Sequence, residues 1–200
     1  MMVKKLLLLF LFTSIAVLSK AQVTDTAVLN KLGDFDIAAL NGDANSAVVI
    51  GEQLLTDTAQ MPSKERVSFF AKLAKAYEGI EQDAKATFYY EKVAAAEPNY
   101  YVAQRALGYL YNDRSEEIQL KLYLTPKDSP AYSALFDSYS RSVRKSLPYL
   151  EKALACDPDD DTLDLIRTLY MNIHDDAGLN SLSSRLTDLS KNCVDLLSDK

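Results

Sequence analysis

A 34-residue spacing of large, small and aromatic side chains is the feature of this sequence that most constrains its fold. Counted from Val67, the pattern falls at positions 4, 7, 8, 11, 20, 24, 27 and 32. The residues at these positions are Phe70, Leu73, Ala74, Tyr77, Ala86, Tyr90, Val93 and Pro98. A second count from Tyr101 places Leu107, Gly108 and Tyr111 at positions 7, 8 and 11. A period near 34 residues is typical of stacked helix pairs, because each pair needs its neighbours to bury its apolar face.

The pattern in residues 67–112 resembles the tetratricopeptide repeat (TPR) family, and part of it returns in residues 146–158. The resemblance covers nearly all of residues 28–197. It implies an all-α, helix–turn–helix solenoid, a TPR-like superhelix of about four helix pairs. Small residues such as Ala74 and Ala86 would let the two helices of a pair approach closely. Pro98 would end the second helix because proline lacks a backbone donor.

The pattern predicts four repeat units. Their approximate bounds are residues 28–61, 67–100, 101–159 and 160–197, with an insertion at 113–145 in the third. Ser63 is predicted to cap the first helix of the second unit, and Asp160 or Asp161 that of the fourth. The last helix is predicted near residues 179–197. Gly51 stands where the pattern expects a bulky aromatic residue, which indicates either a weaker match or a close helix contact.

The third unit is longer than the second. Tyr111 and Ser146 are 35 residues apart, whereas the equivalent Tyr77 and Ala86 are nine apart, so about 26 residues are added. Apolar residues recur there every four positions, at Ala131, Leu135, Tyr139 and Val143. This periodicity predicts a protruding helical hairpin, made by lengthening both helices of the unit, and argues against a disordered insertion. Pro148 is expected to kink or restart the second long helix.

Aromatic residues gather in this predicted hairpin. They are Tyr123, Tyr132, Phe136 and Tyr139. We expect them to pack internally; the alternative is an exposed aromatic patch for a partner. That alternative favours a second function, a structural envelope protein that self-associates through the hairpin or the stack end, and it leaves a homo-oligomer open.

Residues 1–21 have the features of a signal peptide. Two lysines precede an apolar run at residues 6–18, and Ser19 and Ala21 give the small-x-small pattern of a cleavage site. The run is short for a membrane span, although an uncleaved anchor is the alternative. A short segment led by two lysines is typical of bacteria. We therefore expect an exported bacterial protein, periplasmic or secreted, with no membrane span after cleavage.

The net charge of the mature chain disfavours two classes of partner. Removal of residues 1–21 takes away three lysines and no acidic residue, which leaves 19 basic and 28 acidic residues and changes the net charge from −6 to −9. Nucleic acids and anionic membranes bind cationic surfaces. The charge therefore favours neutral or basic partners. We expect a protein or an extended peptide as partner, and no nucleic acid.

The chain has two cysteines, Cys156 and Cys193. In an oxidising compartment they could form a disulfide. They are predicted on different helices whose separation the sequence does not give. We expect two separate small buried residues near helix ends, with the disulfide as the alternative.

The sequence contains little material for catalysis or for a cofactor. His174 is the single histidine and is expected to be an ordinary exposed residue in a turn between helices. Asp157, Asp159 and Asp161 are spaced like the start of a calcium loop, but Thr162 stands where that loop needs glycine. Helix capping explains these aspartates better. We predict no enzyme activity, no cofactor and no metal site.

The TPR resemblance implies a protein-interaction scaffold that binds a partner on its concave face, through inner positions of the first helix of each unit. The candidate partner-binding residues are Lys75, Glu78, Arg105, Tyr109 and Asn112. Four of them, Lys75, Arg105, Tyr109 and Asn112, offer hydrogen-bond donors and an aromatic ring to a peptide backbone or carboxylate. The alternative is that they form a solvated groove wall.

One family function is not implied. The carboxylate clamp of chaperone-binding TPR domains needs lysine and asparagine at positions 5 and 9 of one unit and asparagine at position 6 of the next. Ala71, Lys75 and Ala106 occupy these places here.

Overall fold

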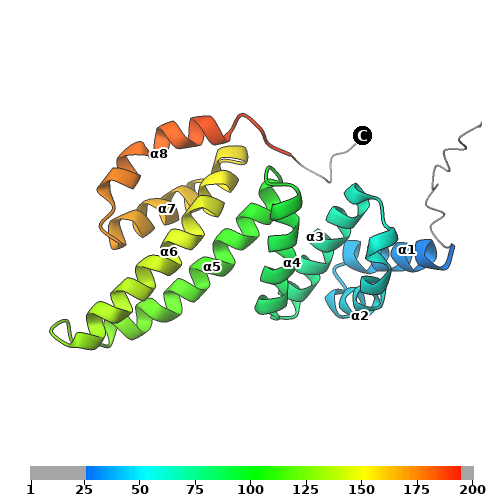
Figure 1. Ribbon diagram of the computed structural model, residues 1–200, viewed down its shortest axis with the longest axis horizontal. Coiled ribbons are helices and arrows are strands. Elements are labelled where there is room, and N and C mark those ends of the chain that lie inside the picture. Colours follow the sequence, from blue (N-terminus) through cyan, green and yellow to red (C-terminus); the bar gives the residue numbers. More distant parts are fainter. Residues whose placement is uncertain (1–25, 195–200) are drawn as a thin grey trace, which may run out of the picture.

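In the computed structural model, residues 26–194 are described, and they form an all-α array of four antiparallel helix pairs (Figure 1). The pairs are α1 (Thr26–Leu40) with α2 (Ala44–Leu54), α3 (Ser63–Gly79) with α4 (Asp83–Ala96), α5 (Tyr101–Tyr123) with α6 (Pro130–Cys156), and α7 (Asp160–Asn172) with α8 (Asp176–Leu189). A short 3₁₀ helix, η1 (Leu55–Gln60), follows α2. The predicted fold class, a TPR-like superhelix of about four pairs with one extended hairpin, is confirmed. The signal peptide predicted at residues 1–21 lies outside the described residues.

Tight turns join the helices within a pair. Gly42 has a φ of 73° in the α1–α2 turn, and Asp43 then caps α2 by accepting a hydrogen bond from the backbone nitrogen of Ser46 at 3.1 Å. Glu81 and His174 also have positive φ, in the turns after α3 and after α7. Each turn reverses the chain in a few residues, so the second helix of a pair packs against the first.

Two glycines let the helices approach closely. A Cβ atom at Gly51 would lie 2.7 Å from Cδ1 of Leu73 and 3.1 Å from the ring of Phe35. A Cβ atom at Gly108 would lie 2.6 Å from the side chain of Leu150 and 3.0 Å from its backbone nitrogen. Of the two interpretations of Gly51, the close helix contact is therefore correct.

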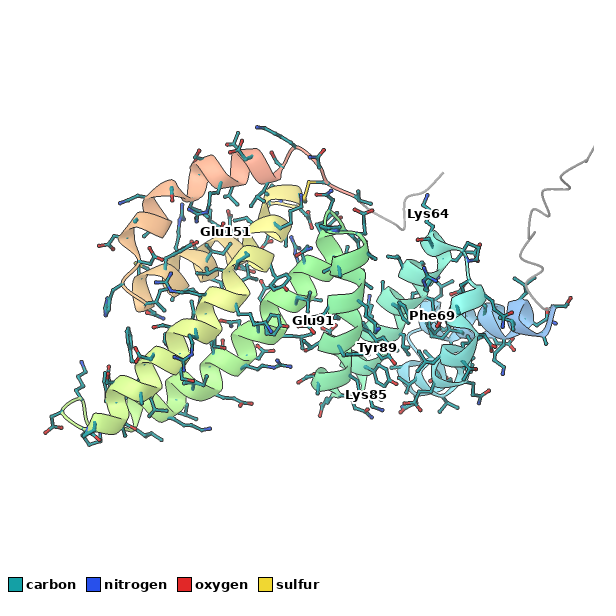
Figure 2. All side chains as sticks on the ribbon, in the orientation of Figure 1. Lys64, Phe69, Lys85, Tyr89, Glu91 and Glu151 are labelled. Carbon is teal, nitrogen blue, oxygen red and sulfur yellow. A yellow bond between two sulfur atoms is a disulfide. The ribbon has the colours of Figure 1, made fainter. Side chains whose placement is uncertain are left out.

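The buried apolar residues form two clusters. The first spans α1 to α5 and includes an aromatic series in which Phe69 lies 4.9 Å from Phe35, and Tyr89 stacks on Tyr77 at 5.6 Å, both between ring centroids (Figure 2). The second is built by α6, α7 and α8 around residues such as Ile166. The interface between α5 and α6 therefore joins the two halves of the stack.

The insertion is an extension of α5 and α6, which protrude together from the stack (Figure 1). Helix α6 continues through Pro148, so the predicted restart there is wrong. Proline removes one intrahelical hydrogen bond, but Leu147 and Leu150 on either side are buried and hold the helix in place. Tyr139 is buried, as expected for internal packing, whereas Tyr123 is 86% exposed. Tyr132 and Phe136 are half-buried.

Two predicted helix caps are wrong by a few residues. Ser63 is the first residue of α3, and Pro62 occupies the cap position. Helix α7 is capped by Asp159, which accepts a hydrogen bond from the backbone nitrogen of Thr162 at 2.7 Å, and not by Asp160 or Asp161. Those two residues lie in the first turn, where their negative charge is favourable beside the helix dipole.

The end of α8 differs most from the prediction. The helix stops at Leu189, because the chain after it is held by other contacts. Cys156 and Cys193 form a disulfide with their Cα atoms 5.5 Å apart, which overturns the expectation of two separate thiols. The bond joins the end of α6 to the segment after α8 (Figure 2). The backbone nitrogen of Val194 then donates to the carbonyl of Asn99 at 2.9 Å, which brings this segment back to the α4–α5 turn.

Candidate functional site

One hollow face of the array is formed by α1, α3 and α5. It holds two adjoining cavities that share Lys72 and Lys75, and we call them together the α3 groove. The first cavity, of about 260 Å³, lies between α3 and the α1–α2 turn. Its lining is mostly small and apolar: Ala39, Leu40, Gly42, Ala44, Ala47, Ala76 and Gly79. The second, of about 80 Å³, extends towards α5 and is lined also by Ser68, Ala71, Tyr90, Tyr100 and Val102.

The sequence of α3 explains this hollow. Ser68, Ala71, Lys75 and Ala76 follow helical spacing, so they share one face of α3. Three of these four side chains are small. The face therefore leaves open space between neighbouring helices, with the stems of Lys72 and Lys75 as its long side chains.

The two lysines of the groove differ in their pairing. The Nζ atom of Lys72 lies 2.8 Å from Oδ1 of Asp36, with both side chains partly exposed. Lys75 is exposed, and no residue within 26–194 forms an ion pair or a hydrogen bond with its ammonium group. The α3 groove therefore carries one uncompensated positive charge between its two cavities.

The charge changes sign one turn further along α3. Glu78 is exposed and accepts a hydrogen bond from the hydroxyl of Tyr90 at 2.9 Å. Partial burial and the nearby carboxylates of Glu116, Asp83 and Glu78 raise the pKa of Asp113 on α5. The carboxylates of Glu78, Asp83, Asp113 and Glu116 thus form a negative region that begins one helical turn after Lys75.

The three candidate residues on α5 are engaged within the chain. Arg105 donates to the carbonyl of Asp157 at 2.6 Å and lies 3.1 Å from the carboxylates of both Asp157 and Asp159. The hydroxyl of Tyr109 lies 2.9 Å from Oγ1 of Thr162. These contacts join α5 to the start of α7.

Asn112 is 3% exposed and donates to Glu116 at 2.8 Å. Lys75 is therefore the one candidate without a hydrogen bond or ion pair to another residue of 26–194, whereas Glu78, Arg105, Tyr109 and Asn112 each have such a partner. The repeat positions of Arg105 and Tyr109 did not predict their contacts, because these contacts depend on where the long third helix pair places α7. The partner-binding role of all five stays a prediction.

Sequence reasoning missed a buried cluster in the second half of the stack. Glu151 is 4% exposed and lies between α6, α7 and α8 (Figure 2). Arg185 donates to both of its carboxylate oxygens, at 2.7 and 2.8 Å, and the hydroxyl of Tyr170 donates to one of them. Burial, and then the hydrogen bond to Glu151, raise the pKa of Tyr170.

These contacts leave the carboxylate of Glu151 fully paired, so the cluster fastens three helices rather than offering a site. The available signal was a charged residue beside the apolar positions of a helix: Glu151 follows Leu150, and Arg185 lies between Leu182 and Leu186. Charged side chains are rarely buried without a partner.

The remaining candidate groups have structural roles or lie at the surface. Asp157 and Asp159 pair with Arg105. Of the three aspartates for which capping was predicted, Asp159 caps α7 and Asp161 lies in its first turn. His174 is exposed in the turn between α7 and α8, as expected. Within residues 26–194, no three His, Cys, Asp or Glu side chains are grouped to hold a metal ion. In the same part of the chain, every helix is too short or too polar to cross a membrane.

Comparison with known proteins gives only distant neighbours. No protein-family model and no curated protein matches the chain. Among solved structures, the chain is similar to one described as "Crystal structure of Podosopora anserina putative kinesin light chain nearly identical TPR-like repeats". The two sequences are 16% identical, and the TM-score is 0.36. The match covers 82% of this chain and 95% of that chain. A variant of the same repeats with a single substitution gives 17% identity and a TM-score of 0.36 over 82% and 94%. Likenesses this low assign neither family nor function, and the fold stands on the helices described above.

Proposed function

We propose that the protein is a non-catalytic interaction scaffold that binds a segment of a protein partner in the α3 groove. The observation that supports this proposal is the unpaired Lys75 between two adjoining cavities. Stacked helix pairs offer elongated surfaces of this kind to extended segments. The carboxylate of Glu151 and the guanidinium of Arg185 are paired with each other between packed helices, so they are not available to a partner.

We also propose that the protein acts outside the bacterial cytoplasm, in the periplasm or as a secreted protein. The sequence of residues 1–21 supports export. The disulfide between Cys156 and Cys193 is a bond of the kind that persists in oxidising compartments.

A cross-linked pull-down from the native envelope tests the scaffold proposal. The bait is the mature chain, compared with Lys75→Glu in the groove and with Lys121→Glu on the outer part of α5. Both variants make the same change of charge, and both lysines are exposed. We expect a distinct protein that the unaltered chain and Lys121→Glu recover equally and that Lys75→Glu recovers several-fold less. Equal recovery by all three baits would reject the groove as the binding surface.

A second candidate function is self-association through the hairpin. Leu120, Tyr123 and Leu124 are 62%, 86% and 72% exposed, and their i, i+3, i+4 spacing puts them on one face of α5 at the hairpin end. An exposed apolar face of this kind favours association with another surface. Light scattering across protein concentrations tests it: a mass that rises with concentration and falls back when all three residues are changed to serine supports it. A constant monomer mass rejects it.

A further inference from the structure

The α3 groove has features that specify the chemistry of the segment it binds, and this inference rests on the proposed function. Its first cavity is built from alanine and glycine with Leu40 at its edge, so its surface is mainly apolar. A cavity of about 260 Å³ exceeds the ~150 Å³ that is enough for a benzene ring in an apolar protein cavity. The first cavity is therefore large enough for a branched or aromatic side chain.

Lys75 determines the charge of the ligand beside that cavity. Lys72 is already paired with Asp36, so the free ammonium group of the groove is that of Lys75. A basic side chain of the ligand would be repelled by the ammonium group of Lys75, and a neutral side chain would form no ion pair with it. A carboxylate gains an ion pair whose strength is that of a partly exposed surface pair.

The second cavity adds a spacing rule. Packed helices lie about 8–10 Å apart, and the two cavities flank α3 on the sides of α1 and α5. In the extended polyproline II conformation a chain advances about 3.1 Å per residue with three residues per turn, so side chains three residues apart point to the same side, about 9 Å apart, and reach both cavities. The second cavity, of about 80 Å³, accepts only a small side chain.

We infer that the α3 groove binds an extended protein segment in which an acidic residue lies next to a large apolar residue. A small residue lies three positions from the apolar one, on the same side of it as the acidic residue. The apolar side chain occupies the first cavity, the acidic side chain pairs with Lys75, and the small side chain fills the second cavity. The carboxylate is that of an aspartate or glutamate side chain within the segment, not that of a chain end.

Capped synthetic peptides test this inference on the mature chain. The probe is acetyl-Gly-Ser-Leu-Glu-Ser-Ala-Ser-Gly-amide, whose blocked ends leave glutamate as its one carboxylate. Amide chemical shifts report both the affinity and the place of binding. We expect Glu→Gln in the peptide to weaken binding about two- to five-fold, the range of an exposed ion pair. Leu→Ser should weaken it by about ten-fold or more, because the apolar contact is lost.

Charge reversal separates recognition from a general loss of structure. The variant Lys75→Glu should reverse the preference, so that the peptide with lysine in place of glutamate binds better than the original. Lys121→Glu should keep the original preference. The variant Ala39→Leu, which fills the first cavity, should weaken binding of the leucine peptide without altering the preference for glutamate over glutamine.

Three results would overturn the inference. The first is that the capped peptide does not bind at concentrations up to about 1 mM, a weak affinity for a protein ligand. The second is that the glutamate and lysine peptides bind equally. The third is that the peptide binds only when its carboxyl end is free. If the envelope partner is nevertheless lost with Lys75→Glu, the scaffold proposal stands and only this ligand chemistry is wrong. If the partner is recovered equally by all baits, the groove itself is rejected.

Discussion

The ammonium group of Lys152 on α6 donates a hydrogen bond to the backbone carbonyl of Leu189, the last residue of α8, at 2.9 Å. It also donates to the carbonyl of Asn192 at 2.6 Å. Lys152 is only 8% exposed, and burial lowers its pKa. A helix end needs partners for its free carbonyls, and a cation there also opposes the negative end of the helix dipole. Lys152 thus explains why α8 ends where it does.

Replacement of this cap should destabilise the last helix pair. Lys152→Met keeps the aliphatic stem but leaves the carbonyls of Leu189 and Asn192 without their donor. We expect a loss of about 1.5–3 kcal/mol in the free energy of unfolding, the range for hydrogen bonds to a charged group. Denaturant unfolding followed by circular dichroism measures it. Lys121→Met, at an exposed position on α5, serves as the control and should change stability little. Equal stability of the two variants would contradict the capping role.

The disulfide should stabilise the same region by a different means. It joins residues 37 positions apart, and loop-closure entropy gives it a contribution of about 4 kcal/mol. Replacement of both cysteines by serine should lower the midpoint of thermal unfolding and increase hydrogen exchange at the amide of Val194, which bonds to Asn99. An unchanged midpoint together with unchanged exchange would show that the bond adds no constraint.

Much of the fold could be predicted because the repeat pattern is local. Tyr77 and Tyr90 occupy the same relative positions in many helix pairs, so their spacing alone indicates two antiparallel helices. The close contact at Gly108 follows from the same pattern, since a small residue is needed where helices cross, whereas Gly51 stands where the pattern expects an aromatic residue. The helical hairpin followed from the four-residue recurrence of Ala131, Leu135, Tyr139 and Val143.

The cysteine pairing and the end of α8 were mispredicted for one physical reason, which is contact between residues far apart in the sequence. Cys193 has helical spacing with Leu186 and Leu189, which predicts a place on α8; its bond to Cys156 and the cap from Lys152 instead draw it out of the helix. Arg105 has the position of a groove residue, but Asp157 and Asp159 engage it. Repeat position alone cannot show which charges find partners in the next pair.

Replacement of glycine by alanine should lower stability at a close helix crossing and raise it where space is open, so Gly33 serves as the control for Gly108. Alanine is normally favoured over glycine inside a helix by about 1 kcal/mol. At Gly33 nothing lies within 4 Å of the place that a Cβ atom would take, so Gly33→Ala should raise stability by up to about that amount. At Gly108 the added atom would lie 3.0 Å from the backbone nitrogen of Leu150, so Gly108→Ala should lower it. Opposite signs in thermal unfolding are expected; a gain at both positions would contradict the close crossing.

Alkaline pH should destabilise the fold through its buried tyrosines. Burial, aided in most cases by a neighbouring carboxylate, raises the pKa of six tyrosines: Tyr77, Tyr89, Tyr90, Tyr111, Tyr139 and Tyr170. Because the pKa of each hydroxyl is higher in the folded state than in the unfolded state, folding is favoured as long as these hydroxyls are protonated. This contribution to stability is complete below the ordinary tyrosine pKa of about 10 and is lost as the pH rises towards the pKa of the folded state. The lowered pKa of Lys152 acts in the opposite direction, but it is a single group.

Denaturant unfolding at a series of pH values tests this expectation. The free energy of unfolding should fall above pH about 10, and the ultraviolet absorbance of tyrosinate should rise in two stages, with the exposed rings before the buried ones. A single stage with the ordinary tyrosine value, without loss of stability, would contradict the burial of these hydroxyls.

The α3 groove as the partner-binding surface is the central claim, and site-specific photo-cross-linking in the native envelope tests it most directly. A photoreactive amino acid is placed at Lys75 in the groove or at Leu124 at the end of the hairpin, both of which are exposed. Adducts with a different protein from position 75, and none from position 124, are the predicted result. Adducts from position 124 alone, whether to another protein or to a second copy of this chain, would place the interaction on the hairpin and contradict the claim.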